Sequence, residues 1–401
     1  MQTKLETKGY SSRDFFIVLV TILLSKSLYY ETYGSNFLLI PFFFLLAFII
    51  IPNIKNFKVD KTILLYSFSL LGLTLMNLDQ SFTQWLVLLI RMLITVMIIH
   101  LISFERFSNA FIRIMLILSV ISWFGLIIIH YNIQSPLPAF TSVHYIEDVQ
   151  GRILRNFIFF GVDESFPKYG IHKTSGLWWE PGAFQVFVNL ALVFSLINNT
   201  ITGKRYIIFL ITILASLSTT GIVAFSLLSI IYFKKYFKIK SSILYSIPLL
   251  ALIFGVIFAT PEIYAKLTSF SFMSRYYDVL ISIHLFSENI FLGYGYGSQV
   301  ENARPYAMEI IDPQLYPFIV PAGTDGITMF IAQVGILGFI FMIPLLYPKY
   351  FQHLDLYIRI LISLSLFLIF NTQHFTHMLI FIVLIFYGLV GNKKINYPPK
   401  E

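Results

Sequence analysis

The chain has 401 residues, of which 57% are hydrophobic and only 12% charged, against roughly a quarter charged in an average soluble domain. A soluble core could not bury so much apolar surface, so this composition excludes an ordinary soluble domain and indicates an integral membrane protein. Cysteine is absent, which excludes disulfides, thiolate catalysis and cysteine-ligated metal sites. The net charge of +8 does not require a nucleic-acid partner, because membrane proteins concentrate Lys and Arg on their cytoplasmic side.

Apolar runs near the length of a membrane-spanning helix follow one another along the chain. The first, residues 15–30, follows a basic segment and has no small-residue cleavage site after it, so we expect an uncleaved helix rather than a signal peptide. The next runs are residues 37–52, 63–76, 85–104, 114–130, 177–197, 242–260 and 327–347.

Two further apolar segments, residues 206–233 and 360–390, are interrupted by polar residues at 216–221 and 371–377. Each segment could be one long tilted helix or two short helices that turn at the polar centre. Lys and Arg flank both ends of each segment, which places both ends on the cytoplasmic side. We therefore expect two hairpins of short helices, with roughly 11–14 residues in each helix.

These elements predict an all-α, polytopic integral membrane protein. It would have about twelve transmembrane helices, including the two short hairpin pairs, and both termini in the cytoplasm. Residues 1–401 would form a single transmembrane domain with no soluble domain. Two large loops, residues 131–175 and 261–325, would lie on the external side of the membrane.

The second large loop is expected to contain a helix that ends at Asn289 or Gly293. Arg275, Asp278 and Ser282 align on one face of this helix. Its other face is formed by Met273, Tyr276, Tyr277, Leu280, Ile281 and His284. The Gly-Tyr-Gly-Tyr-Gly turn at 293–297 would let the backbone approach a ligand or another helix closely.

Basic residues in both loops are candidates for binding a diphosphate carried by a lipid, because guanidinium groups pair bidentately with phosphate oxygens. In the first loop these residues are Arg152, Arg155, Lys168, His172 and Lys173. The alternative for each of them is contact with lipid head groups. Arg275 is favoured because a helix fixes it beside the glycine-rich turn. Its alternative is a surface ion pair with Asp278.

Glu180 stands in the stretch Ser-Gly-Leu-Trp-Trp-Glu-Pro-Gly-Ala-Phe at 175–184, beside Trp178 and Trp179. Pro181 suits the first turn of a helix, which places Glu180 at or next to the N-cap. One interpretation is that the carboxylate only stabilises the helix end. The other is a general base that takes a proton from an acceptor hydroxyl. The tryptophans could anchor the chain at the membrane interface or form a platform for a sugar face.

Three other polar features have weaker functional interpretations. Asp325 precedes the last single run and could be its N-cap. His374 and His377 could share a metal, but no third ligand is evident, so no metal site is predicted. Arg91 lies within an apolar run and is expected to face the interior of the bundle, either as a structural residue or on a substrate path. No Walker loop, metalloprotease motif or nucleophile elbow occurs.

The chain resembles the O-antigen polymerase and ligase superfamily of bacterial membrane glycosyltransferases over roughly residues 152–339. The segment at 175–184 is similar to the family's Gly-Leu-Phe-x-x-Pro motif, and the Ser/Thr-rich break at 216–221 also has a counterpart. The helix that begins near Arg275 and runs into the Gly-x-Gly turn has a counterpart in the family as well. The Gly-Ile-Leu-Gly of residues 335–338 has one too. Ligases of this family usually carry a His-Asn pair before Gly-Ile-Leu-Gly, where this chain has Thr324-Asp325-Gly326. His172-Lys173 stand in place of the usual basic residue before the Gly-Leu-Phe segment. Both differences favour a polymerase over a ligase.

The resemblance implies transfer of a glycan from undecaprenyl diphosphate to another lipid-linked repeat unit at the periplasmic face, for O-antigen of lipopolysaccharide or for capsule. No cofactor or metal is implied, because the leaving group is already good. The lipid-linked donor and acceptor, the bilayer and a chain-length regulator would be the partners. Glu180 and Arg275 would be catalytic. Substrate would be bound by Arg152, Arg155, His172, Lys173, Trp178, Trp179, Tyr276, Asp278 and Asp325. A ligase-type transferase is the first alternative, and a non-catalytic transporter or flippase is the second.

Overall fold

The computed structural model describes residues 11–25, 27, 35–52, 57, 59–76, 82–130, 141–145, 153–157, 160–168, 171–178, 180–237, 270–295, 308, 326–371 and 378–391. Most of these residues are helical, as expected. The helices before the first large loop are α1 (Ser12–Leu23), α3 (Ser35–Ile50), α4 (Lys61–Met76), α5 (Phe82–Leu101) and α6 (Phe104–His130). Those that follow are α7 (Pro181–Ile197), α8 (Gly203–Ser216), α9 (Thr219–Phe237), α12 (Phe270–Glu288), α14 (Ile327–Val334), α15 (Leu337–Leu346), α16 (Leu356–Asn371) and α17 (Leu379–Val390), with a 3-10 turn at η4 (Lys349–Phe351). The expected helix at 242–260 lies outside the described residues.

The first large loop departs from the all-α expectation because it folds into a four-stranded antiparallel sheet in the order β1-β2-β3-β4. Its strands are β1 (Thr141–Tyr145), β2 (Ile153–Phe157), β3 (Phe160–Lys168) and β4 (Ile171–Gly176). The strands are short and mix β-branched or aromatic residues with polar ones, so they suit a half-buried pleated surface rather than a spanning helix. β3 and β4 pack on α6, and β4 also touches α7 and α8.

One described helix, α6, is long and apolar enough over Phe104–Ile127 to cross a membrane by length and composition, and seven shorter apolar helices accompany it. This helix begins at Phe104 rather than at the expected residue 114. The Ser103 carbonyl accepts a hydrogen bond from the Phe107 N–H at 2.9 Å, which starts the helix there. The first ten residues of α6 include several polar ones, so a search for continuous apolar runs does not detect this part of the helix. Arg91 of α5 is only 8% exposed, which confirms that it faces the interior.

The first interrupted segment is a hairpin, as predicted. α8 ends at Leu217, whose left-handed backbone (φ 48°) reverses the chain before α9 begins. Near the start of α8, the Tyr206 hydroxyl donates to Ser229 Oγ at 2.8 Å, and the Tyr206 ring stacks on Tyr232 at 4.1 Å. Ser229 and Tyr232 belong to the second half of α9, so the two helices are antiparallel and both distal ends lie on one side.

The second interrupted segment also reverses direction. The ring centre of Phe370, at the end of α16, lies 5.5 Å from the ring centre of Phe381, near the start of α17. At the other end, Arg359 Nη1 in the first turn of α16 donates to the Tyr347 hydroxyl, just after α15, at 2.8 Å. Gly388 of α17 packs against the backbone of Pro344. Both far ends therefore meet the last turns of α15. The turn at 372–377, including His374 and His377, lies outside the described residues.

The expected span at 327–347 is interrupted, so its prediction as one helix is wrong. α14 ends at Gly335, which has φ 69°, and α15 starts two residues later. The turn that follows α12 packs into this break: the Ile336 N–H donates to the Ile290 carbonyl at 2.6 Å, and the Gly295 N–H donates to the Gln333 carbonyl at 2.8 Å. The glycine-rich turn was expected to approach either a ligand or another helix. Its described part approaches the break between helices α14 and α15.

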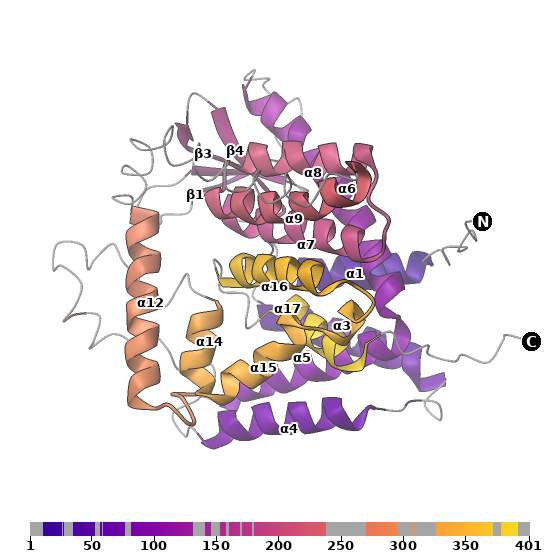
Figure 1. Cartoon of the computed structure of the whole chain (residues 1–401), viewed down its shortest axis with the longest axis vertical. Coiled ribbons are helices and arrows are strands. Elements are labelled where there is room, and N and C mark those ends of the chain that lie inside the picture. Colours follow the sequence, from indigo (N-terminus) through magenta and orange to yellow (C-terminus); the bar gives the residue numbers. More distant parts are fainter. Residues whose placement is uncertain are drawn as a thin grey trace, which may run out of the picture.

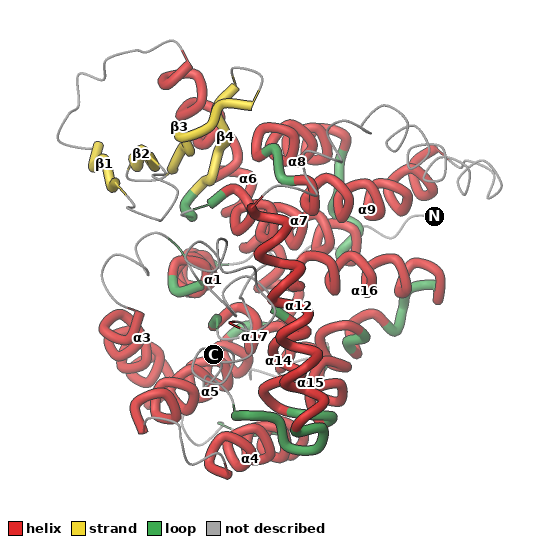
Figure 2. The backbone as a smooth tube through the Cα atoms, turned by 90° about the vertical axis from the view of Figure 1, so that its left-hand side faces the viewer, coloured by secondary structure: helices red, strands yellow, loops and turns green. Residues whose placement is uncertain are grey.

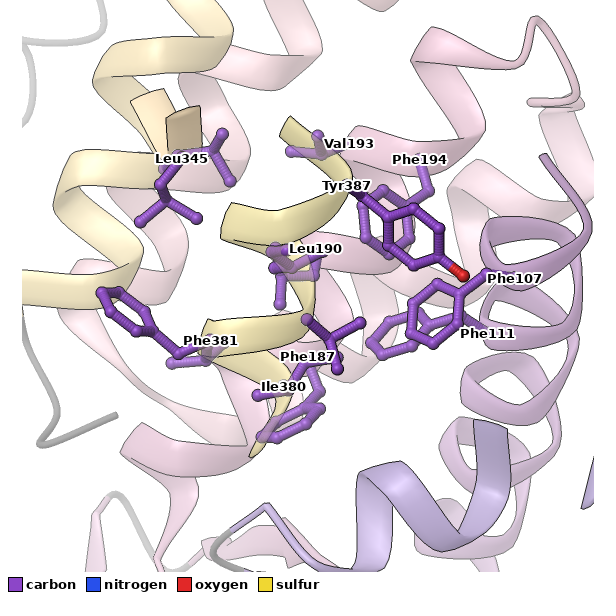
Figure 3. Packing of buried hydrophobic residues seen from close by; sticks show 14 of the residues in the cluster. Phe107, Phe111, Phe187, Leu190, Val193, Phe194, Leu345, Ile380, Phe381 and Tyr387 are labelled. Atoms are coloured by element: carbon purple, nitrogen blue, oxygen red, sulfur yellow. The ribbon is translucent and has the colours of Figure 1, made fainter. Parts of the chain in front are cut away.

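The core lies where α6, α7 and α17 meet (Figure 3). Tyr387 of α17 is 1% exposed, and its ring centre lies 5.2 Å from that of Phe107. Its hydroxyl donates to the Ile102 carbonyl at 2.8 Å. One turn further along the same face of α6, the Phe111 ring packs against Phe194 of α7, with ring centres 5.1 Å apart. These aromatic contacts hold the central helix α7, all but two of whose residues are buried, between α6 and its other neighbours.

The bundle helices α7, α8, α9 and α16 run side to side in Figure 1, and α12 runs across their left-hand ends. Figure 2, seen from that side, shows α12 in front of the bundle, with the sheet beside its upper end. The sheet of the first predicted loop and helix α12 of the second therefore lie toward the same end of the bundle in these views.

Candidate functional site

Glu180 lies where the sheet joins the bundle, at the end of the connection from β4 to α7. As predicted, it is the N-cap residue of α7 and Pro181 opens the first turn. Its backbone is extended (φ −144°, ψ 151°), and its carbonyl accepts from the Ala183 and Phe184 N–H groups. Its side chain makes no capping hydrogen bond and is half-buried. The carboxylate therefore stands at the helix end without being used to close it.

Trp178 is fully buried, with 0% exposure. Its ring stacks on Phe187 at 4.2 Å and on Phe184 at 5.5 Å. Its indole N–H donates to the Ser25 carbonyl at 3.2 Å, just beyond the end of α1. In this conformation no ring face is left for a sugar, so Trp178 positions the connection to Glu180. Trp179 lies outside the described residues.

The basic residues of the first loop are distributed over the sheet. His172 and Lys173, on β4, are both half-buried. The Nδ1 atom of His172 is buried and has no hydrogen-bond partner. Arg155 is on β2, paired with Val143 and Val162 across the neighbouring strands, and nothing is described of its side chain. Arg152 lies outside the described residues.

α12 confirms the predicted helix in the second loop, but its burial pattern differs from the expected one. Asp278 and Ser282, on the predicted polar face, are 0% and 1% exposed, whereas Tyr276 is 49% exposed. Ile281 is buried, so the inward face is mixed. The Ser282 hydroxyl donates to the Asp278 carbonyl at 2.7 Å and lies 3.7 Å from the Met329 sulfur of α14. The helix therefore turns part of its polar face toward α14.

Arg275 lies in the first half of α12, whereas the glycine-rich turn follows the other end of this helix, so the prediction that Arg275 lies beside that turn is wrong. It is half-buried, and its Nε atom is buried without a hydrogen-bond partner. None of the ion pairs among the described side chains joins Arg275 to Asp278. The guanidinium keeps donor capacity for an anion.

The far end of α12 carries a separate polar group. The Tyr294 hydroxyl donates to the Glu288 carboxylate, and Glu288 also pairs with His284 at 3.2 Å. Desolvation and the Glu288 carboxylate together raise the pKa of Tyr294 to about 12. Asp325 lies outside the described residues, and the N-cap of α14 is Gly326 rather than Asp325.

Two polar residues of α7 were missed by the sequence analysis. Gln185 and Asn189 are both 0% exposed, and the Asn189 amide donates to Gln185 Oε1 at 3.0 Å and to the Gly221 carbonyl of α9 at 3.2 Å. The available signal was a pair of amides four residues apart in an otherwise apolar helix, a spacing that places both on one face. Gly221 belongs to the Ser/Thr-rich break, so α7 and this break meet at the pair.

Among the described residues, the start of α7 has a carboxylate that makes no capping bond, β4 has a histidine whose buried Nδ1 is unpaired, and α12 has an arginine whose buried Nε is unpaired. A carboxylate can remove a proton from a hydroxyl, and a guanidinium can stabilise a departing phosphate. Nucleophile activation and leaving-group stabilisation are the two tasks of a glycosyl transfer from a lipid diphosphate.

Comparison with known families identifies this architecture. Residues 206–343, from α8 through the second loop to α15, match the family model described as O-antigen ligase. No curated protein and no solved structure matches the chain. The matched region contains Arg275 and the Gly-Ile-Leu-Gly break, while Glu180 precedes it. Members of this family are membrane-associated glycosyltransferase-like enzymes of polysaccharide biosynthesis. Over residues 206–343 the chain is therefore similar to the O-antigen ligase family, and this match supports its resemblance to the O-antigen ligase and polymerase superfamily.

Proposed function

We propose that this protein is a polymerase. It would join oligosaccharide repeat units linked to undecaprenyl diphosphate into O-antigen or capsular polysaccharide at the periplasmic face of the inner membrane. The observation that carries the proposal is the Glu180 side chain, which stands at the N-cap of α7 without making the capping bond. This position offers a general base beside the loop that holds the basic residues.

In the proposed reaction, Glu180 accepts the proton of the acceptor hydroxyl as its oxygen attacks the anomeric carbon of the donor sugar. The bond from that carbon to the diphosphate oxygen breaks, and undecaprenyl diphosphate leaves. Arg275 stabilises the charge that develops on the diphosphate, with Arg152 or Arg155 as a second cation. His172, Lys173, Trp179, Tyr276, Asp278 and Asp325 would bind the remainder of the two substrates.

The proposed membrane topology has about twelve crossings with both termini in the cytoplasm. Two antiparallel hairpins, α8–α9 and α16–α17, support it, because each returns the chain to the side from which it started. The sheet and α12 at one end of the bundle support a periplasmic site (Figure 1). Lipid-linked donor, acceptor and a chain-length regulator are the proposed partners.

The test is the length distribution of surface polysaccharide in a deletion strain that carries the wild-type gene or a variant. We expect the deletion to leave single repeat units on the lipid. Glu180→Gln and Arg275→Ala should fail to restore the ladder, because loss of a general base slows transfer by about a hundredfold or more. Glu105→Gln is the matched control, since this exposed carboxylate opens α6 away from the site.

A ladder that persists at wild-type length in the deletion strain would contradict the polymerase. Full-length glycan that stays on undecaprenyl diphosphate would identify a ligase, the activity that the matched family description prints. Thr324-Asp325-Gly326, in place of the His-Asn pair of ligases, favours the polymerase. Repeat units retained in the cytoplasm would identify a flippase instead.

A further inference from the structure

Inside the bundle, one polar pair has hydrogen-bonding capacity that the fold does not use. Gln185 and Asn189 are 0% exposed, yet Gln185 Nε2 and Asn189 Oδ1 have no hydrogen-bond partner. Buried polar atoms are nearly always paired, because each unpaired one costs free energy. Such exceptions concentrate at functional sites, where the unpaired atoms are kept for a ligand.

The orientation of both amides follows from the contacts around them. The Gly221 carbonyl can only accept, so the group of Asn189 that faces it must be the donor Nδ2. The same Nδ2 donates to Gln185 at 3.0 Å, so the Gln185 atom that faces it must be Oε1. Nε2 of Gln185 and Oδ1 of Asn189 are therefore the two open atoms. Each shares a carbon with one of the two atoms that form the Nδ2–Oε1 hydrogen bond.

Gly221 keeps the first turn of α9 against this pair. A Cβ at Gly221 would lie 2.8 Å from Cβ of Gln185 and 3.2 Å from its Oε1, so only glycine permits the approach. Gln185 and Asn189 lie about 7 Å and about 13 Å along α7 from Glu180, at 1.5 Å per residue. The pair is therefore in the half of α7 that begins at Glu180, and Gly221, which contacts it, follows the α8–α9 turn at Leu217 by four residues.

The open atoms define the chemistry of what they bind. One is a donor and the other an acceptor, whereas a phosphate oxygen at neutral pH mainly accepts and a cation needs acceptors only. A hydroxyl group both accepts and donates, so it can satisfy both atoms.

We propose that Gln185 and Asn189 form a hydroxyl-binding subsite for a sugar of the lipid-linked repeat unit, reached by displacement of the α8–α9 turn. This inference rests on the proposed function for the identity of the glycan. The subsite recognises sugar hydroxyls rather than the diphosphate, which separates it from Arg275. It would make α7 responsible for both proton removal and sugar selection.

The test uses the full-length protein in lipid nanodiscs and the lipid-linked single repeat unit that the deletion strain accumulates. Initial elongation rates against repeat-unit concentration give kcat and KM, and melting temperatures are recorded with and without the repeat unit. Gln185→Met has a similar shape but no polar atom, and Asn189→Leu removes the open acceptor together with the Nδ2 donor that bonds Gln185 and Gly221. Ser119→Ala is the control, since Ser119 Oγ is also buried and unpaired but belongs to α6.

We expect Gln185→Met to raise KM about tenfold or more, while the protein without substrate melts at an unchanged or higher temperature. The rise in melting temperature caused by the repeat unit should shrink in this variant and persist in Ser119→Ala. Asn189→Leu should give the same loss of binding.

Unchanged KM and an unchanged substrate-induced rise in Gln185→Met would overturn the inference and leave the pair as a site for bound water only. A wild-type protein that binds the repeat unit without elongating it would instead contradict the polymerase. The subsite would then be judged by the melting temperatures alone. No binding by the wild-type protein would contradict both.

Discussion

Gly293 and Gly335 lie backbone against backbone, one in the turn after α12 and the other in the break between α14 and α15. A Cβ on Gly293 would lie 2.3 Å from the carbonyl oxygen of Gln333, and one on Gly335 would lie 2.4 Å from the carbonyl oxygen of Phe291. Both glycines have positive φ, 68° and 69°. This contact joins the C-terminal end of α12 to the bundle. Arg275 lies near the other end of the same helix.

Gly335→Ala should destabilise the protein by about 2 kcal/mol or more, because the new methyl group meets backbone and the left-handed conformation disfavours alanine. The measurement is the thermal midpoint of the purified protein in detergent. Gly72→Ala is the matched control: nothing lies within 4 Å of a Cβ at this helical position in α4, so alanine should be neutral or stabilise by up to about 1 kcal/mol. Equal midpoints for the two variants would show that the backbone contact is absent.

Glu180→Gln should leave stability within about 0.5 kcal/mol of wild type, because the carboxylate makes no capping bond that the change could remove. Ser11→Ala is the comparison. Ser11 caps α1 through the Asp14 N–H at 3.2 Å in a capping box, and its loss should cost about 1 kcal/mol. Thermal midpoints of both variants decide this. A destabilised Glu180→Gln would mean that Glu180 serves the helix end and would remove the main support for its catalytic role.

Sequence patterns predicted most helices and both hairpins, because apolar length and flanking charge are local properties. They also placed Glu180 at the N-cap, since Pro181 marks a first turn. The sheet was missed because its strands depend on pairing between residues far apart, such as Thr141 with Phe157. Trp178 was misjudged for the same reason: its burial depends on Ser25, 153 residues away. The break at Gly335 was missed because it depends on the approach of the turn at Gly293.

Asp14 of α1 is fully buried and is held by Arg106 of α6, whose Nε donates to Asp14 Oδ2 at 2.8 Å. Arg106→Ala should destabilise the protein by about 2–3 kcal/mol, because it leaves the buried carboxylate with only the more distant Arg13, at 3.8 Å, as a cation. Adding Asp14→Asn to Arg106→Ala should recover part of this loss, since no charge then remains to be compensated. Thermal midpoints of the two single variants and the double variant form the cycle. Strictly additive losses would show that the two side chains do not interact.

If both helices of the α8–α9 hairpin cross the membrane, a cysteine in its turn and a cysteine at its ends should be labelled from opposite sides. The sequence has no cysteine, so each introduced one is the single labelling site. Thr219→Cys, exposed at the start of α9, should react with a membrane-impermeant maleimide added outside intact spheroplasts. Lys204→Cys, exposed at the start of α8, should react only after the membrane is opened. This follows because antiparallel helices that each cross the bilayer place turn and ends on opposite sides. Labelling of both from outside, or of neither, would refute the double crossing and reduce the proposed number of crossings.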